Sequence, residues 1–175
     1  MLSADMVKRL NEHVNLEFFS SNLYLQMSAW AETKGLEGCG VYLRAQAHEE
    51  QEHMERLFKY VHETGSMPVI GAIDAPPTGV ESVSGLFKQV YEQEQLITRK
   101  INELMDSALK ENDHSTVTFL QWYVTEQIDE EHQIQMLLDQ IENIGEEGSG
   151  VYFIDQAVGK REQDHQQVDR HGQQH

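Results

Sequence analysis

Acidic side chains interrupt the apolar stripe of every long helix that the sequence predicts. Each stripe is traced in steps of three and four residues, the spacing that keeps side chains on one face of a helix. In the segment AQAHEEQEHMERLF the stripe passes through Ala47 and Met54 but has Glu50 between them, with His53 on nearly the same side. The other stripes are interrupted at comparable depth by Glu17, Glu94, Glu126 and Glu130.

The cost of burying these acids indicates a bound cation. An isolated buried carboxylate costs several kcal/mol, so five of them would exceed the roughly 5–15 kcal/mol by which whole domains are stable. The stripes contain no Lys or Arg that could neutralise them. Protonation would relieve some of these acids, whereas a bound cation would relieve all of them at once.

The types of ligand favour iron or manganese. Carboxylates with one imidazole suit these ions better than zinc, which favours thiolate and imidazole, or calcium, which seldom takes nitrogen. Five carboxylates around His53 exceed the needs of one ion, but two ions bridged by a carboxylate would use them all. Glu17 and Glu94 on separate helices, with Glu50-x-x-His53 on another, match the ligand pattern of di-iron helical bundles.

Neighbouring residues also have ordinary interpretations. A Glu-x-x-His spacing can arise by chance in a chain rich in both residues. The position of Glu50 and His53 in the apolar stripe, rather than their spacing, therefore indicates a metal site. Glu49 borders the expected site. Tyr24 lies two turns after Glu17 on the same face, where a core tyrosine and a functional tyrosine are equally open. Trp122 is expected to pack in the core, and no role is assigned to His13.

Composition narrows the classes of partner. The chain has 175 residues, 39% of them hydrophobic, which is enough for one domain with a substantial core. Lys and Arg number 13 against 30 Asp and Glu, so a net charge of −17 argues against nucleic acid or an anionic membrane as a partner. Cys39, the single cysteine, excludes sites that need paired thiolates. Without an apolar run of signal-peptide or membrane-spanning length, we expect a cytoplasmic protein.

The periodic segments predict an all-α protein. We expect helices at about 4–34, 38–64, 84–111 and 114–145, because the three prolines all lie within residues 66–83. Roughly 18 extended residues reach about 59 Å, enough to run past a helix about 42 Å long, so this connection fits a four-helix bundle with one long crossover. The segment GSGVYFIDQAVG indicates a short C-terminal fifth helix. One domain of residues 1–158 is therefore expected, followed by a disordered polar tail rich in His and Gln at 159–175.

Several segments of the chain resemble those of the non-haem bacterial ferritins. The segments NLEFFSSNLYLQMSAW, EEQEHM, FLQWYVTEQ and GVYFID carry the resemblance, which covers about residues 1–157 in one register. It implies a ferritin-like four-helix bundle that assembles into a hollow shell of twenty-four subunits. Such shells oxidise Fe(II) with dioxygen or peroxide and store the product as ferric mineral. The resemblance thus implies iron storage and ferroxidase activity.

The resemblance also implies roles for single residues. One iron would be held by Glu17, Glu50 and His53, and Glu50 would bridge to a second iron. The second iron would also bind Glu94 and Glu130, with Gln127 beside the pair. A third, inward iron site would use Glu49, Glu126 and Glu130 with the acid at position 129, here Asp129. Tyr24 would supply a further electron during oxidation.

Some positions depart from related families. Asp129 is one methylene shorter than the Glu of similar ferritins, which weakens the third site. Thr118 and Gln121 stand where animal ferritins place the acids of their iron channels. Bacterioferritins need a methionine for haem where this chain has Gln51, so we expect no haem, and His132 is expected to lie outside the site. The alternatives are a bacterioferritin-like protein, a di-iron oxidase that stores no iron, and a structural bundle whose acids face solvent.

Overall fold

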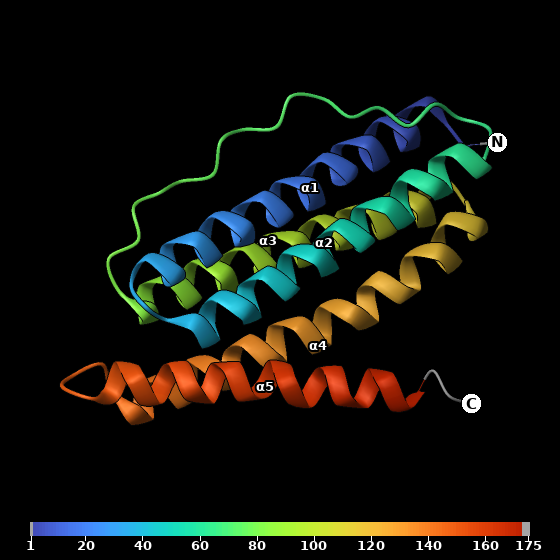
Figure 1. Ribbon diagram of the computed structural model, residues 1–175. Helices are drawn as coiled ribbons and strands as arrows, with labels where there is room; N and C mark the ends of the chain where they lie inside the picture. Colours follow the sequence, from blue (N-terminus) through green and yellow to red (C-terminus); the bar gives the residue numbers. More distant parts are fainter. Residues whose placement is uncertain (1, 173–175) are drawn as a thin grey trace.

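The computed structural model describes residues 2–172, with the side chains of residues 2–162. Within these residues five helices follow one another: α1 (Ala4–Thr33), α2 (Glu37–Glu63), α3 (Val83–Lys110), α4 (His114–Ile144) and α5 (Gly150–Gly172). The predicted all-α class, a four-helix bundle with a further C-terminal helix, is confirmed (Figure 1). None of the described helices is both long enough and apolar enough to cross a membrane.

Local chemistry sets the starts of α1 and α4 and the end of α4. Ser3 Oγ accepts the backbone N–H of Met6 at 3.0 Å, and Asp113 Oδ1 accepts that of Thr116 at 3.1 Å, so both helix starts carry a side-chain cap. Gly145 directly follows α4 with a φ of +76°, a conformation that glycine adopts at little cost. The predicted boundaries of the first four helices agree with the structure to within a few residues.

The long crossover runs the length of the bundle along α1 (Figure 1). The side chains of two asparagines of α1 hold the crossover by accepting hydrogen bonds from its backbone N–H groups. Asn11 Oδ1 accepts the N–H of Val69 at 2.9 Å, and Asn15 Oδ1 accepts the N–H of Gly71 at 2.7 Å. The crossover returns the chain to the end from which α2 began, so α2 and α3 run parallel, as predicted.

A polar layer divides the core of the bundle into two apolar clusters. One cluster contains Leu23, Val90 and Ile134, and the other contains Leu10 and Ile97 among its buried side chains. Between them each of the four long helices contributes at least one buried carboxylate: Glu17 from α1, Glu50 from α2, Glu94 from α3 and Glu130 from α4. The apolar clusters therefore fix the four helices on both sides of the acids.

Helix α5 packs on α2 and α4 and extends further than the sequence predicts. The prediction places a disordered tail from residue 159, but α5 continues to Gly172. Val158 and Glu162 are buried one turn apart, and Arg161 donates to Gln140 Oε1 of α4 at 3.0 Å. Contacts with the bundle therefore hold the part of this segment up to residue 162, whose composition alone indicates disorder. Residues 173–175 of the expected tail lie outside the described residues.

The start of α2 depends on α5. Leu36 provides no side-chain cap for α2; instead Asp155 Oδ1 of α5 accepts the N–H of Cys39 at 2.8 Å. The helices meet at glycines, because a Cβ atom on Gly38 would lie 2.2 Å from the carbonyl oxygen of Asp155, and one on Gly159 would lie 2.9 Å from Gly38 Cα. Asp155 thus acts as an N-cap supplied by another helix.

We predict that Asp155→Ala lowers the free energy of unfolding by about 1–2 kcal/mol, the usual cost of a lost N-cap. Thermal melting and urea unfolding would measure the loss. Asp106→Ala is the matched control, since Asp106 is exposed on α3. Equal stability of the two variants would contradict the capping role.

Candidate metal centre

Three ligand-type residues form a fully buried group at the centre of the bundle. Glu17 of α1 is 0% exposed, Glu50 of α2 is 1% exposed and His53 of α2 is 4% exposed. One potential ligand atom from each lies within 4.8 Å of the other two. Glu17 Oε2 and Glu50 Oε2 are buried without a hydrogen-bond partner, and an acceptor left so is costly. These two oxygens are suited to bind a cation.

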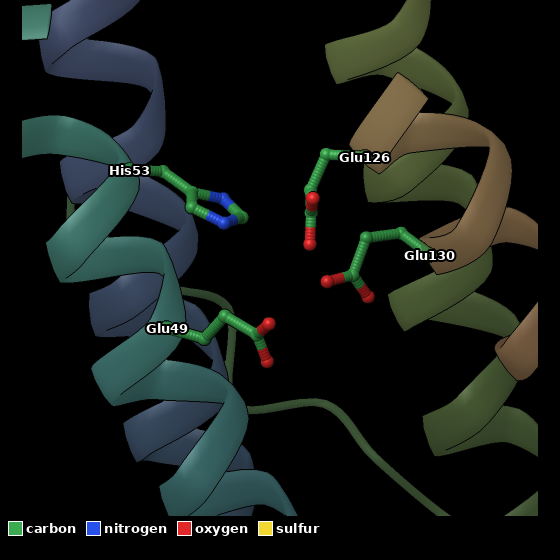
Figure 2. A group of neighbouring side chains, drawn as sticks. All are labelled: Glu49, His53, Glu126 and Glu130. Atoms are coloured by element: carbon green, nitrogen blue, oxygen red, sulfur yellow. The ribbon is translucent and has the colours of Figure 1, made fainter. Parts of the chain in front are cut away.

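A second group shares His53 and lies between α2 and α4. It consists of Glu49, His53, Glu126 and Glu130, whose ligand atoms also lie within 4.8 Å of one another. Figure 2 shows the two residues of α2 pointing across the bundle toward the two glutamates of α4. Glu49 and Glu126 are only partly buried, so this group borders the buried one.

Glu94 of α3 completes the set of buried carboxylates. Its Oε1 accepts a hydrogen bond from the Tyr24 hydroxyl, and its Oε2 accepts the side-chain N–H of Gln127 at 3.1 Å. Both partners are buried, Tyr24 completely. The structure therefore connects Tyr24 directly to a candidate ligand, while the sequence leaves core and functional roles for this tyrosine open.

The predicted stripe of α4 is wrong at one position beside the site, where Gln127 is buried instead of Glu126. Gln127 is buried together with Tyr123 and Glu130, whereas Glu126 is half-buried. Asp129 is exposed and belongs to neither group of ligand-type residues found in the described part of the chain. The α4 contribution to the buried centre is therefore Glu130 with Gln127, and Glu126 reaches the site from its edge.

His13 contacts the site although the sequence analysis assigns it no role. It is 3% exposed, and its Nε2 lies 2.9 Å from Glu17 Oε1. The two residues are four positions apart in α1, the spacing at which side chains meet on a helix. That spacing was visible in the sequence, but nothing distinguished it from the other histidine and glutamate pairs at similar distances.

His53 is held by aromatic residues of α4. The Tyr123 hydroxyl donates to the backbone carbonyl of His53 at 2.7 Å, and the Trp122 ring packs edge-on at 5.3 Å between ring centres. Arg56 lies over Trp122, 4.3 Å from the ring centre. The expected packing role of Trp122 thus includes a direct contact with a candidate ligand.

The carboxyl groups of the site have unequal acidity. Burial, followed by the charges of Glu94 and Glu17, raises the pKa of Glu50 well above its usual range. Burial and the charges of Glu49 and Glu94 do the same for the pKa of Glu130. Burial also acts to raise the pKa of Glu17, but the neighbouring His13 outweighs it and the pKa is lowered. A cation would stabilise the ionised forms of all these groups.

Comparison with known proteins identifies the family. Residues 7–144 match the ferritin family model, described as a ferritin-like domain. The chain belongs to the ferritin family. It is 49% identical over 159 residues to a probable bacterial non-heme ferritin-like protein of Haemophilus influenzae, covering 91% of this chain and 96% of the relative. It is 46% identical over 158 residues to a bacterial non-heme ferritin of Escherichia coli O6:H1, covering 90% and 96%.

Solved structures agree with this assignment. An open pore ferritin from the archaeon Archaeoglobus fulgidus superposes on this ferritin with a TM-score of 0.88 at 35% identity, covering 90% of this chain and 96% of the other. The predicted ferritin-like bundle and the resemblance to non-haem bacterial ferritins are confirmed. The alternative of a bundle whose acids face solvent is wrong, because Glu17, Glu50, Glu94 and Glu130 are all buried.

We predict that metal-free ferritin loses stability as the pH rises from about 5 to 8. Burial, opposed by hydrogen bonds from Tyr24 and Gln127, raises the pKa of Glu94 from 4.5 to about 7. The folded state keeps this proton where the unfolded chain has released it, so the contribution is full below pH 4.5 and is lost as the pH rises through 7. It is on the order of 3 kcal/mol.

Urea unfolding of the metal-free protein at several pH values would measure this loss. Glu94→Gln is the control, because it removes the titrating group and leaves the other charges in place. The difference between the two proteins should grow from pH 5 to pH 8, and a constant difference would contradict the assignment to Glu94.

Proposed function

We propose that this protein is an iron-storage ferritin with ferroxidase activity, and that Fe(II) is oxidised at a pair of sites in the centre of each bundle. One Fe(II) would bind Glu17, Glu50 and His53. The other would bind Glu50, Glu94 and Glu130. The observation that carries the proposal is the pair of unpartnered, buried carboxylate oxygens on Glu17 and Glu50. The donor set, carboxylates with one imidazole, is the type that suits iron.

The negative charge of the carboxylates at the site favours oxidation of Fe(II). Each Fe(II) gives up one electron, and dioxygen takes up the two electrons with two protons to form hydrogen peroxide. The product Fe(III) carries one more positive charge than the substrate. Hard, anionic carboxylates therefore favour the oxidised product over the reduced one, which drives the oxidation. The ferric product would then move to the mineral store.

Glu50 and Tyr24 are the proposed catalytic residues. The charges of Glu94, Glu17 and Glu130 all raise the pKa of Glu50, so Glu50 is close enough to each of them to interact. This position suits a carboxylate that bridges two cations. The Tyr24 hydroxyl donates a hydrogen bond to Glu94 Oε1. We propose that Tyr24 supplies one further electron and a third Fe(II) another, so that with two protons the peroxide is reduced to two waters, while the phenolic proton of Tyr24 passes to Glu94.

A third iron is proposed at the edge of the pair, on Glu49, Glu126 and Glu130. Partial exposure of Glu49 and Glu126 supports a site of weaker affinity through which iron exchanges with the pair. Asp129 belongs to the proposed set only if it turns inward when iron binds, because its side chain is exposed.

Assembly and location are further parts of the proposal. We propose a shell of twenty-four subunits in the cytoplasm, without haem. Large apolar side chains exposed on the single chain support burial against other copies, among them Leu25, Tyr152 and Phe153. Membership of the ferritin family supports an oligomeric cage.

The first test is aerobic addition of Fe(II), followed by size exclusion with iron and protein recorded together. We predict that the wild type takes up many irons per chain in a shell-sized peak, and that Glu50→Ala oxidises Fe(II) at least tenfold more slowly, because the bridging ligand is gone. Glu52→Ala is the matched control, since Glu52 is exposed on α2. Uptake that stops at two or three irons per chain, in a small particle, would instead favour a di-iron oxidase that stores no iron.

Tyr24→Phe tests the electron-donor role separately. We predict slower turnover of Fe(II) in stopped-flow oxidation, with anaerobic Fe(II) binding kept or tightened, because the phenylalanine keeps the packing and removes only the hydroxyl that is bonded to Glu94. Oxidation as fast as that of the wild type would remove Tyr24 from the mechanism.

A further inference from the structure

His13 holds one specific oxygen of Glu17. Its Nε2 lies 2.9 Å from Glu17 Oε1, while Glu17 Oε2 is buried without a hydrogen-bond partner. A carboxylate oxygen accepts, so in this contact the imidazole donates to Oε1 through Nε2–H. One oxygen is thus committed to a partner on the same helix, and the other is left for a ligand.

The imidazole is fixed between helices. It packs edge-on against Tyr123 of α4, with 6.5 Å between ring centres. The hydroxyl of Tyr123 donates to the backbone carbonyl of His53, a ligand in the proposed function. His13 therefore contacts both Glu17 of α1 and Tyr123 of α4, and Tyr123 in turn binds the backbone of α2. Packing between these helices fixes the position of the imidazole.

A surface cavity reaches the outer side of His13. It has a volume of about 210 Å³ and lies between α1 and α3, lined by His13 together with Arg9, Lys100 and Glu103. His13 thus forms part of the cavity wall and contacts Glu17 by its Nε2. A small molecule in the cavity would be next to this residue.

We propose that His13 is a positioning residue, which holds Oε1 of Glu17 so that this carboxylate offers Fe(II) its Oε2 alone. The proposal rests on the proposed function, since it concerns the same iron site. A hydrogen-bonding partner of a metal ligand typically contributes 10–100-fold to metal affinity, because it orients the ligand before the ion arrives. We expect an effect of that size on the Fe(II) bound by Glu17.

The test compares His13→Leu with His13→Gln. Both side chains have similar volume, but only glutamine keeps an N–H that can reach Glu17. Anaerobic titration with Fe(II) should show affinity weakened about 10–100-fold in His13→Leu and largely kept in His13→Gln. Magnetic circular dichroism of the ferrous protein should show a changed coordination geometry only in His13→Leu, since its Glu17 is free to bind through both oxygens. Equal affinity and equal spectra in the two variants would overturn the proposal.

Added imidazole gives a second measurement. In His13→Ala, imidazole from solution should enter through the cavity and restore Fe(II) affinity, whereas the wild type and His62→Ala, which lacks an exposed histidine of α2, should not respond. Absence of rescue, together with His13→Gln behaving as His13→Leu, would assign His13 to packing alone.

Wild type and Glu50→Ala, titrated in parallel, separate this proposal from the proposed function. If the wild type binds Fe(II) and Glu50→Ala does not, the iron site stands and the His13 variants decide the positioning role. If the wild type itself binds no Fe(II), the proposed function fails and the role of His13 fails with it.

Discussion

The burial of four carboxyl groups at one level of a helical bundle is the constraint on which the rest of this ferritin depends. Each acid would be costly to bury in charged form, and together they repel one another. Hydrophobic packing on both sides, in two separate apolar clusters, holds the helices that carry them. The carboxylates of the site repel one another, while the packed helices keep them in place. A bound cation would relieve this repulsion without a large rearrangement of the helices, which favours binding.

Long helices and one crossover make this arrangement possible. The four acids come from four different helices, so no short segment could bring them together. Asn11 and Asn15 attach the crossover to α1, and the glycine contact between Gly38 and Gly159 lets α5 close the end at which α2 begins. The positions of the ligands are therefore determined by contacts far from them, which is why the fold and the site are inseparable.

Local signals account for what the sequence predicts correctly. Ser3, Asp113 and Gly145 mark helix ends by short-range chemistry, and the glutamates stand out because each breaks an apolar period. In α4 the period fails to choose between Glu126 and Gln127, because both are polar and adjacent, and only packing decides that Gln127 points inward. The same limit applies to α5, where composition does not reveal the contact of Arg161 with α4, and to His13, whose partner is visible only once burial is known.

The structure treats the two ends of the buried site differently. Glu17 has one oxygen bound by His13 and one without a partner, so an ion approaching it breaks no hydrogen bond. Glu94 has both oxygens engaged, by Tyr24 and by Gln127, and must give up at least one of these bonds to bind. Since a lost hydrogen bond to a charged group costs about 1.5–3 kcal/mol, the two irons of the proposed function would bind with unequal affinity. On that proposal the first iron would favour the side of Glu17, and its charge would then make release of Glu94 from its partners less costly for the second.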